Sequence, residues 1–285
     1  MINLAKRNLY IYFRSPSNVL LSLMATLIVL LVYILFLGGN SGATYPMLDN
    51  SNLFMNTWLL AGMCALAPLS TSLSIVSAII ADRMQGVDRD FLASPVARYK
   101  IAGGYLISGT TGSFIVTCTV FIISLVWLVL SGAAVPSLTI FVKCLIIIAL
   151  TCICSSCITF FIASLIRKNG AYNSIGTIVG TLGGFLSAIY LPFGQLPSAM
   201  QTVVKLFPPS HAAVLMRSTL LEGISSVSYA STPTADLAKV FKYLGVRLSS
   251  SNGIIPLWTS FAVLISCAIL FFGLSCFSVS YKRSK

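Results

Sequence analysis

Side chains that could catalyse a reaction or bind a metal are scarce in this sequence. Its 285 residues include one histidine, six acidic residues and eight cysteines. The closest grouping of metal-binding type is Cys152-x-Cys154-x-x-Cys157, whose thiolates are ligands that zinc accepts. No histidine or hydrophilic segment accompanies these cysteines, and the single histidine, His211, has no Cys, Asp or Glu beside it. Packing of small side chains is the better interpretation of the cysteines, so we predict no metal site and no catalytic residue.

The most strongly charged stretch of the chain alternates acidic and basic side chains. We assign its charged residues, with the aromatic residue that follows them, to a docking element: Asp82, Arg83, Asp88, Arg89, Asp90 and Phe91. Apolar residues in and after this stretch would make it amphipathic, and Ser94-Pro95 marks a turn behind it. Docking on a soluble partner at the cytoplasmic face is our prediction; a solvated loop is the alternative.

Long uncharged segments must position these few polar residues. Apolar residue types make up 57% of the chain and charged residues 8%, whereas a soluble domain has about a quarter charged residues. Six segments are long enough to cross the hydrocarbon core of a membrane. The predicted spans are Val19–Leu37, Leu53–Ile80, Ile101–Leu130, Leu138–Ile166, Ser174–Leu191 and Ile254–Val279. The sequence therefore predicts an all-α, polytopic integral membrane protein with one transmembrane domain over residues 1–285.

The basic residues give this arrangement an orientation. They lie mainly between the spans and do not form the basic face of a nucleic-acid-binding protein, so we expect no nucleic acid partner. With six spans, twelve of the eighteen Lys and Arg residues fall on the side that holds both termini. Because cytoplasmic loops carry the excess of Lys and Arg, both termini are predicted to be cytoplasmic. We expect a multi-pass protein of a bacterial plasma membrane.

Two segments outside the spans are expected to be helical. Residues 1–16 are basic and amphipathic: Ile2, Ala5, Leu9, Tyr12 and Phe13 share one face, and Asn3, Lys6, Arg7 and Arg14 share another. This pattern predicts an interfacial helix on the cytoplasmic leaflet, with an ordinary basic flank of the first span as the alternative. Residues 192–253 form a long outer segment with helical spacing at His211–Leu221 and Leu237–Leu244, joined by a serine-rich linker.

A row of serines lies on one face of the second predicted span. Ser70, Ser74 and Ser77 line this face, and Asn56 lies far from them along the same span. A polar wall of a substrate pathway is one interpretation. Simple packing is the other, because serine hydroxyls can bond to carbonyl groups of their own helix.

A row of glycines recurs in the fifth predicted span. Gly176, Gly180 and Gly184 are spaced by four residues, and small residues at this spacing let helices approach closely in lipid. The row favours an interface with a second subunit, although packing within one subunit fits the pattern equally well.

The segment from Gly86 to Ser94-Pro95-Val96, with an acidic residue just before it and Arg98 just after it, is similar to the intracellular loop of type-2 (ABC-2) ATP-binding-cassette exporter permeases. The resemblance covers nearly the whole chain, including the N-terminal helix, the spans and proline-rich outer half-helices such as Leu191–Pro197. The glutamate usual at the start of the family's loop is Asp82 here.

The resemblance implies a function and partners. It implies that residues 81–100 couple the permease to ATP-binding-cassette ATPase subunits, and that a second permease subunit, identical or different, completes the complex. The sequence has no G-x-x-x-x-G-K-[ST] motif, so ATP and Mg²⁺ would bind the partner ATPase and this chain would hold no cofactor. We expect export of an amphipathic or hydrophobic drug, lipid or peptide. The alternatives are an ATP-independent carrier and a membrane assembly or scaffold protein.

Overall fold

The computed structural model describes residues 1–24, 28, 48–87, 96–166, 168–230, 232–250 and 253–281. Within these residues, helices make up the fold and the only strands are β1 (Ser249–Ser250) and β2 (Gly253–Ile254), a two-residue antiparallel pair. The longer helices are α1 (Ile2–Arg14), α4 (Ser51–Val76), α7 (Arg98–Leu130), α8 (Leu138–Leu165), α9 (Asn169–Leu186), α11 (Pro208–Gly223) and α14 (Leu257–Tyr281). The shorter ones are α5 (Ala78–Met84), η1 (Phe193–Gln195), α10 (Ser198–Leu206), α12 (Ser225–Ser228) and α13 (Thr234–Tyr243).

Four helices in the described part of the chain are long and apolar enough to cross a membrane. They cover Ser51–Met84, Tyr99–Leu130, Leu138–Leu165 and Leu257–Ser275. These correspond to the second, third, fourth and sixth predicted spans. The first predicted span, Val19–Leu37, lies mostly outside the described residues, although residues 16–24 are helical.

The fifth predicted span differs from the helix found there. α9 covers Asn169–Leu186, so the predicted end at Leu191 is wrong by five residues. The chain turns at Ser187 and Ala188, where Ala188 has a φ of 50°, a conformation that ends a helix. With polar residues in its first turns, α9 is not among the four helices that qualify as spans by length and composition.

Local sequence signals explain where several helices begin. The side chain of Asn50 accepts a hydrogen bond from the Leu53 amide (3.0 Å) and caps α4. Ser137 caps α8 in the same way, through the Ile140 amide. Proline at the first position of α11 needs no hydrogen-bonded amide there, which suits a helix start.

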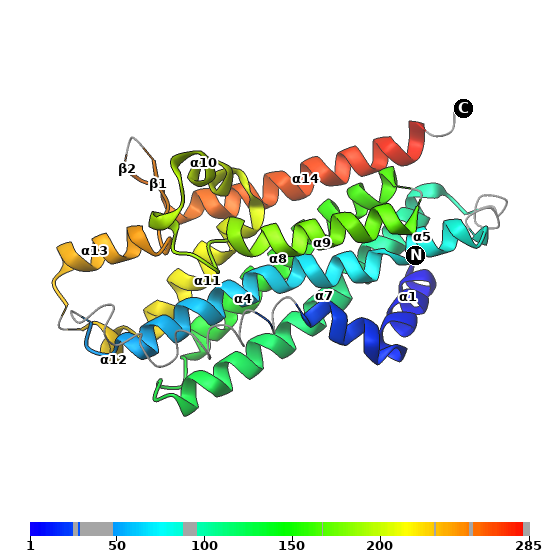
Figure 1. Cartoon of the computed structure of the whole chain (residues 1–285). Helices are drawn as coiled ribbons and strands as arrows, with labels where there is room; N and C mark the ends of the chain where they lie inside the picture. The colour runs from blue at the N-terminus through cyan, green and yellow to red at the C-terminus, as the bar shows by residue number, and fades with distance from the viewer. Residues whose placement is uncertain are drawn as a thin grey trace.

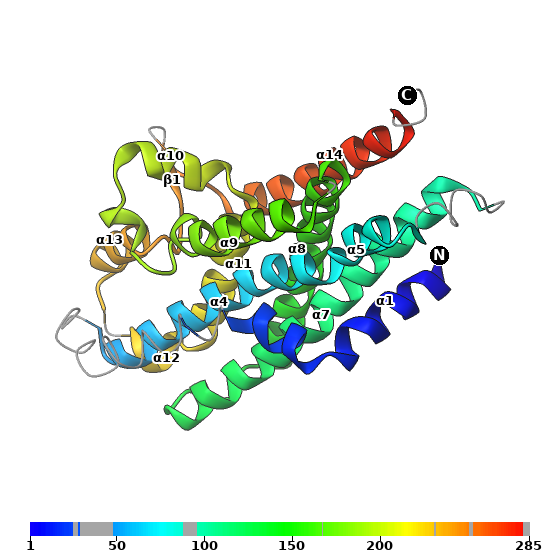
Figure 2. The same cartoon turned by 45° about the vertical axis from the view of Figure 1, so that its right-hand side comes forward.

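The helix α4 lies at the centre of the bundle and packs against α7, α8 and α11. It is the most buried of the four candidate spans and α14 the least. The cartoon shows α5, α1 and the C-terminal end of α14 at one end of the bundle, with α12 and α13 toward the other (Figure 1). Seen from a second direction, α1 lies alongside α7, as the contacts between them require (Figure 2).

The outer faces of α7 and α14 are apolar and exposed, as expected of helices in lipid. Isoleucine, leucine, valine and aromatic side chains are exposed along both helices, for example Ile123, Trp127, Ile269 and Phe272. The three clustered cysteines point inward. Cys152 and Cys154 pack in one apolar cluster and Cys157 in another, which fits the packing interpretation of the sequence pattern.

The apolar face predicted for α1 only partly matches the face that is buried in the structure. Ala5 and Tyr12 are buried against the bundle as expected, but so is Asn8, while Ile2 and Phe13 are exposed. α1 lies along α7, where a Cβ added at Gly104 would come within 2.9 Å of the Leu4 side chain. The exposed apolar side chains of α1 are therefore free to contact a membrane surface.

Candidate functional site

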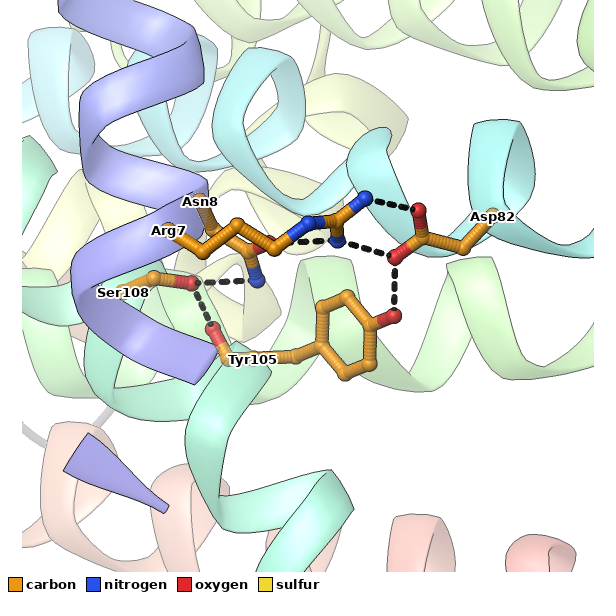
Figure 3. Close-up of polar contacts among 5 residues, drawn as sticks. All are labelled: Arg7, Asn8, Asp82, Tyr105 and Ser108. Atoms are coloured by element: carbon orange, nitrogen blue, oxygen red, sulfur yellow. Dashed lines mark hydrogen bonds and ion pairs between the residues drawn. The ribbon is translucent and has the colours of Figure 1, made fainter. Parts of the chain in front are cut away.

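A polar junction joins α1, α5 and α7 at the end of the bundle where α5 lies (Figure 3). Two guanidinium nitrogens of Arg7 on α1 donate to the two carboxylate oxygens of Asp82 on α5, at 2.8 Å and 2.7 Å. The phenol of Tyr105 on α7 also donates to this carboxylate. The hydrogen bonds with Asp82 raise the pKa of the Arg7 guanidinium above its ordinary value. A two-point arginine–carboxylate pair fixes orientation as well as distance, so the junction holds three helices in one geometry.

The same junction is extended on both sides. Asn8 donates to the Ser108 hydroxyl on α7 at 3.4 Å, and Ser108 donates to the Tyr105 carbonyl at 2.8 Å. On α5, Arg83 donates to the carbonyls of Ala163 and Ile166 at 2.8 Å and 2.9 Å. Ala163 lies in the last turn of α8 and Ile166 is its C-cap, where carbonyl groups lack the amides of a following turn. Arg83 therefore ties α5 to the end of α8.

A groove of about 770 Å³ lies between α4, α9 and the residues that follow α1. Ser70 and Ser74 of α4 line one wall, together with Ser77, which is the C-cap of this helix. The opposite wall carries residues of α9: Tyr172, Asn173, Gly176, Thr177, Gly180 and Thr181. All the described residues that line the groove are uncharged. Hydroxyl and amide groups thus face one another across a space large enough for a small amphipathic molecule.

The structure brings together three of the four residues predicted to line a pathway. Ser70, Ser74 and Ser77 share the groove, whereas Asn56 lies outside its lining. Asn56 is half-buried and belongs to the first turns of α4, several turns from Ser70.

The three glycines of the predicted row have different surroundings. A Cβ at Gly176 or Gly180 would meet nothing within 4 Å, so no part of the described chain packs on them. At Gly184 a Cβ would lie 2.1 Å from the Tyr190 ring of the same chain. Gly184 is thus required for packing within the subunit, and of the three only Gly176 and Gly180 have no packing partner among the described residues.

Toward the other end of α4 lies a buried arginine that the sequence patterns did not single out, although it falls within the predicted outer helix His211–Leu221. Arg217 on α11 is 1% exposed, and its guanidinium lies 4.3 Å from the ring centroid of Trp58. It donates to the carbonyls of Trp58 (3.3 Å) and Ala188 (2.8 Å). Trp58 in turn donates to the Leu244 carbonyl at 2.7 Å. These contacts join α4, the turn after α9, α11 and the end of α13.

Comparison with known proteins decides the family. The family model for ABC-2 family transporter proteins matches residues 44–277, which is most of the chain. The chain belongs to the ABC-2 transporter family. It is therefore a multi-pass membrane protein and a component of a membrane transporter. No curated protein matches this ABC-2 protein in sequence.

The geometry of this ABC-2 protein divides the residues predicted to contact an ATPase. Asp82 and Arg83 point into the bundle, where both make the hydrogen bonds described above. The side chain of Asp82 is only 4% exposed, so a role in coupling would be indirect, through α1 and α7. Asp88, Arg89, Asp90 and Phe91 lie outside the described residues. Their contact with an ATPase remains a prediction.

Proposed function

We propose that this ABC-2 protein is the permease subunit of an exporter driven by ATP, which a separate ATP-binding-cassette ATPase hydrolyses. The observation that carries the proposal is the Arg7–Asp82–Tyr105 junction. It attaches α1 to α5 and α7, and α5 lies just before the charged residues 88–90 in the sequence. A force applied to that segment from the cytoplasm would therefore reach α1, α4 and α7 together.

The uncharged groove supports an amphipathic or hydrophobic cargo, such as a drug, lipid or peptide. Ion-coupled carriers usually place ionisable groups near the middle of the membrane, whereas the groove of this protein is lined by hydroxyl, amide and apolar groups. The open faces of Gly176 and Gly180 border the same groove. A second permease subunit would close it there, so that the path runs between two subunits.

The proposal also includes the orientation of the chain. Both termini and the Arg7–Asp82 junction would be cytoplasmic, with α10–α13 outside, in the plasma membrane of a bacterium. The distribution of Lys and Arg supports this orientation.

The test is co-purification followed by reconstitution. The chain would be expressed with candidate ATP-binding-cassette ATPases encoded near it, and the complex placed in liposomes. We expect a stable complex whose ATP hydrolysis is several times faster than that of the ATPase alone, and transport that stops when the catalytic base of the ATPase is removed. Substrate movement by the chain alone, at an unchanged rate, would instead identify an ATP-independent carrier.

A further inference from the structure

A second groove, separate from the path between α4 and α9, lies among α8, α11, α13 and α14. Its volume is about 500 Å³, and it shares no lining residue with the first groove. Three charged side chains line it: Lys143 on α8, Glu222 on α11 and Arg247 after α13. Apolar side chains also line it, among them Ile146, Ile147, Leu215 and Phe261.

The polar and apolar parts are ordered along the helices. Lys143 lies near the start of α8, and Ile146 and Ile147 lie about one turn further along it. On α14, Leu257 begins the helix and Phe261 lies about one turn deeper. The charged residue of α8 thus lies near the start of that helix, and the apolar lining residues extend toward the middles of α8 and α14.

The neighbouring residues place the charged end at the level of the lipid headgroups. Trp258, the second residue of α14, is 68% exposed, and exposed tryptophans are enriched at the membrane–water interface. Ile146 is also 58% exposed at the mouth of the groove, so an acyl chain entering there would continue into the surrounding lipid. The two ends of the groove match the two ends of a lipid molecule.

The net charge of the groove lining favours an anionic lipid headgroup. Lys143 and Arg247 outnumber Glu222, so the lining carries a net charge of +1. The Lys143–Glu222 pair is long, at 3.4 Å, and both side chains are about half exposed. Such a pair contributes little to stability, so a phosphate group can displace Glu222 from Lys143 at small cost.

We propose that this groove binds an anionic phospholipid, its phosphate between Lys143 and Arg247 and an acyl chain over Ile146 and Phe261. The lipid is resident and distinct from the exported molecule, since the groove lies apart from the proposed path. In the proposed orientation it belongs to the outer leaflet. The lipid would fill the space between α8, α11 and α14 and hold the outer helices in place.

Native mass spectrometry of the purified full-length chain in a neutral detergent tests the proposal. Phosphatidylglycerol and phosphatidylcholine with identical acyl chains would be titrated separately, and inorganic phosphate would be added as a competitor. We expect phosphatidylglycerol to bind at least several-fold more tightly than phosphatidylcholine, with no competition by millimolar phosphate. Equal binding of the two lipids, or full displacement by phosphate, would overturn the proposal.

Charge variants then locate the site. Lys143→Gln and Arg247→Gln should each weaken phosphatidylglycerol binding about fivefold, since one basic residue near a membrane surface contributes about 1 kcal/mol to binding anionic lipid. Lys242→Gln removes an exposed charge of α13 that does not line the groove, and should change nothing. Glu222→Gln should strengthen binding, because it removes the competing carboxylate from an exposed position without threatening the fold. Equal effects of the three Lys and Arg variants, or no gain with Glu222→Gln, would place the lipid elsewhere.

Discussion

Arg7 and Asp82 are separated by 75 positions in the sequence, yet they form a two-point ion pair with nitrogen–oxygen distances of 2.7 Å and 2.8 Å. The Asp82 side chain is almost fully buried, whereas that of Arg7 is 37% exposed. The carboxylate therefore depends on Arg7 and Tyr105 for its stability in the folded chain, and α1 depends on the carboxylate for its position.

Removal of the cation should destabilise the junction. Arg7→Gln leaves the buried Asp82 carboxylate without its counter-charge, and we expect a loss of about 2 kcal/mol, less than for a fully buried pair because Arg7 is partly exposed. The double variant Arg7→Gln/Asp82→Asn should recover part of this loss. Thermal unfolding of the purified chain measures both. Lys6→Gln, an exposed neighbour on α1, serves as the control, and an equal effect there would show that the ion pair has no special role.

The charged segment beyond α5 should be needed for docking on the ATPase. Asp88→Lys combined with Asp90→Lys places like charges in the proposed contact, which can cost several kcal/mol in a binding site. We expect normal membrane insertion but loss of complex formation and of stimulated ATP hydrolysis, measured on the co-purified complex. Full assembly and full turnover of this double variant would mean that the segment is only solvated.

Replacing two different glycines of α9 should affect two different properties: the association of subunits and the stability of the single subunit. Gly180→Leu adds a side chain where the described chain leaves open space, so the single subunit should keep its stability while its association with a second subunit weakens. Gly183→Leu is the contrasting variant, because a Cβ there already lies 2.9 Å from Leu66, and it should lower the stability of the subunit itself.

Crosslinking tests the same interface directly. Thr177 is exposed on α9 and lies on the side of Gly176 and Gly180, so Thr177→Cys should form an intersubunit crosslink in a complex that still transports. Absence of the crosslink in an active complex would place the subunit interface on another helix.

Arg217 should be required for the arrangement of α11 on α4. Arg217→Leu leaves the carbonyls of Trp58 and Ala188 without this donor, and we expect a loss of about 3 kcal/mol in the free energy of unfolding. Arg217→Lys should not restore stability, because an ammonium cannot reproduce the planar stacking and divergent hydrogen bonds of a guanidinium. Thermal unfolding provides the comparison, with the exposed Lys239→Leu as control. Similar midpoints for Arg217→Leu and Lys239→Leu would contradict this role.

Orientation in the membrane can be tested with an impermeant thiol reagent on intact cells. Val135 in the α7–α8 connection is 78% exposed, and Gln85 at the end of α5 is exposed at the opposite end of the bundle. We expect Val135→Cys to react in intact cells and Gln85→Cys only after the membrane is opened. Seven of the eight cysteines, all but Cys276, are buried or half-buried, so the unmodified chain supplies the background. The reverse pattern would invert the proposed topology.

The sequence by itself determined four of the helices that are long and apolar enough to cross the membrane. Lipid offers no hydrogen bonds, so each span must be a long uncharged helix, and α4, α7, α8 and α14 lie where apolar runs predicted them. The serine row of α4 was also predictable, because it depends only on helical spacing.

Tertiary structure alone decided where the charged side chains point and where α9 ends. Asp82 lies in a charged stretch of the sequence and Arg217 in an apolar one, and neither stretch identifies the distant helix against which the side chain is buried. The end of α9 at Leu186 depends on the turn at Ala188, whose carbonyl accepts a hydrogen bond from Arg217. The contacts of Arg217 form only when α11 packs on α4. Packing then supplies the hydrogen-bond partners that compensate the cost of removing the guanidinium from water.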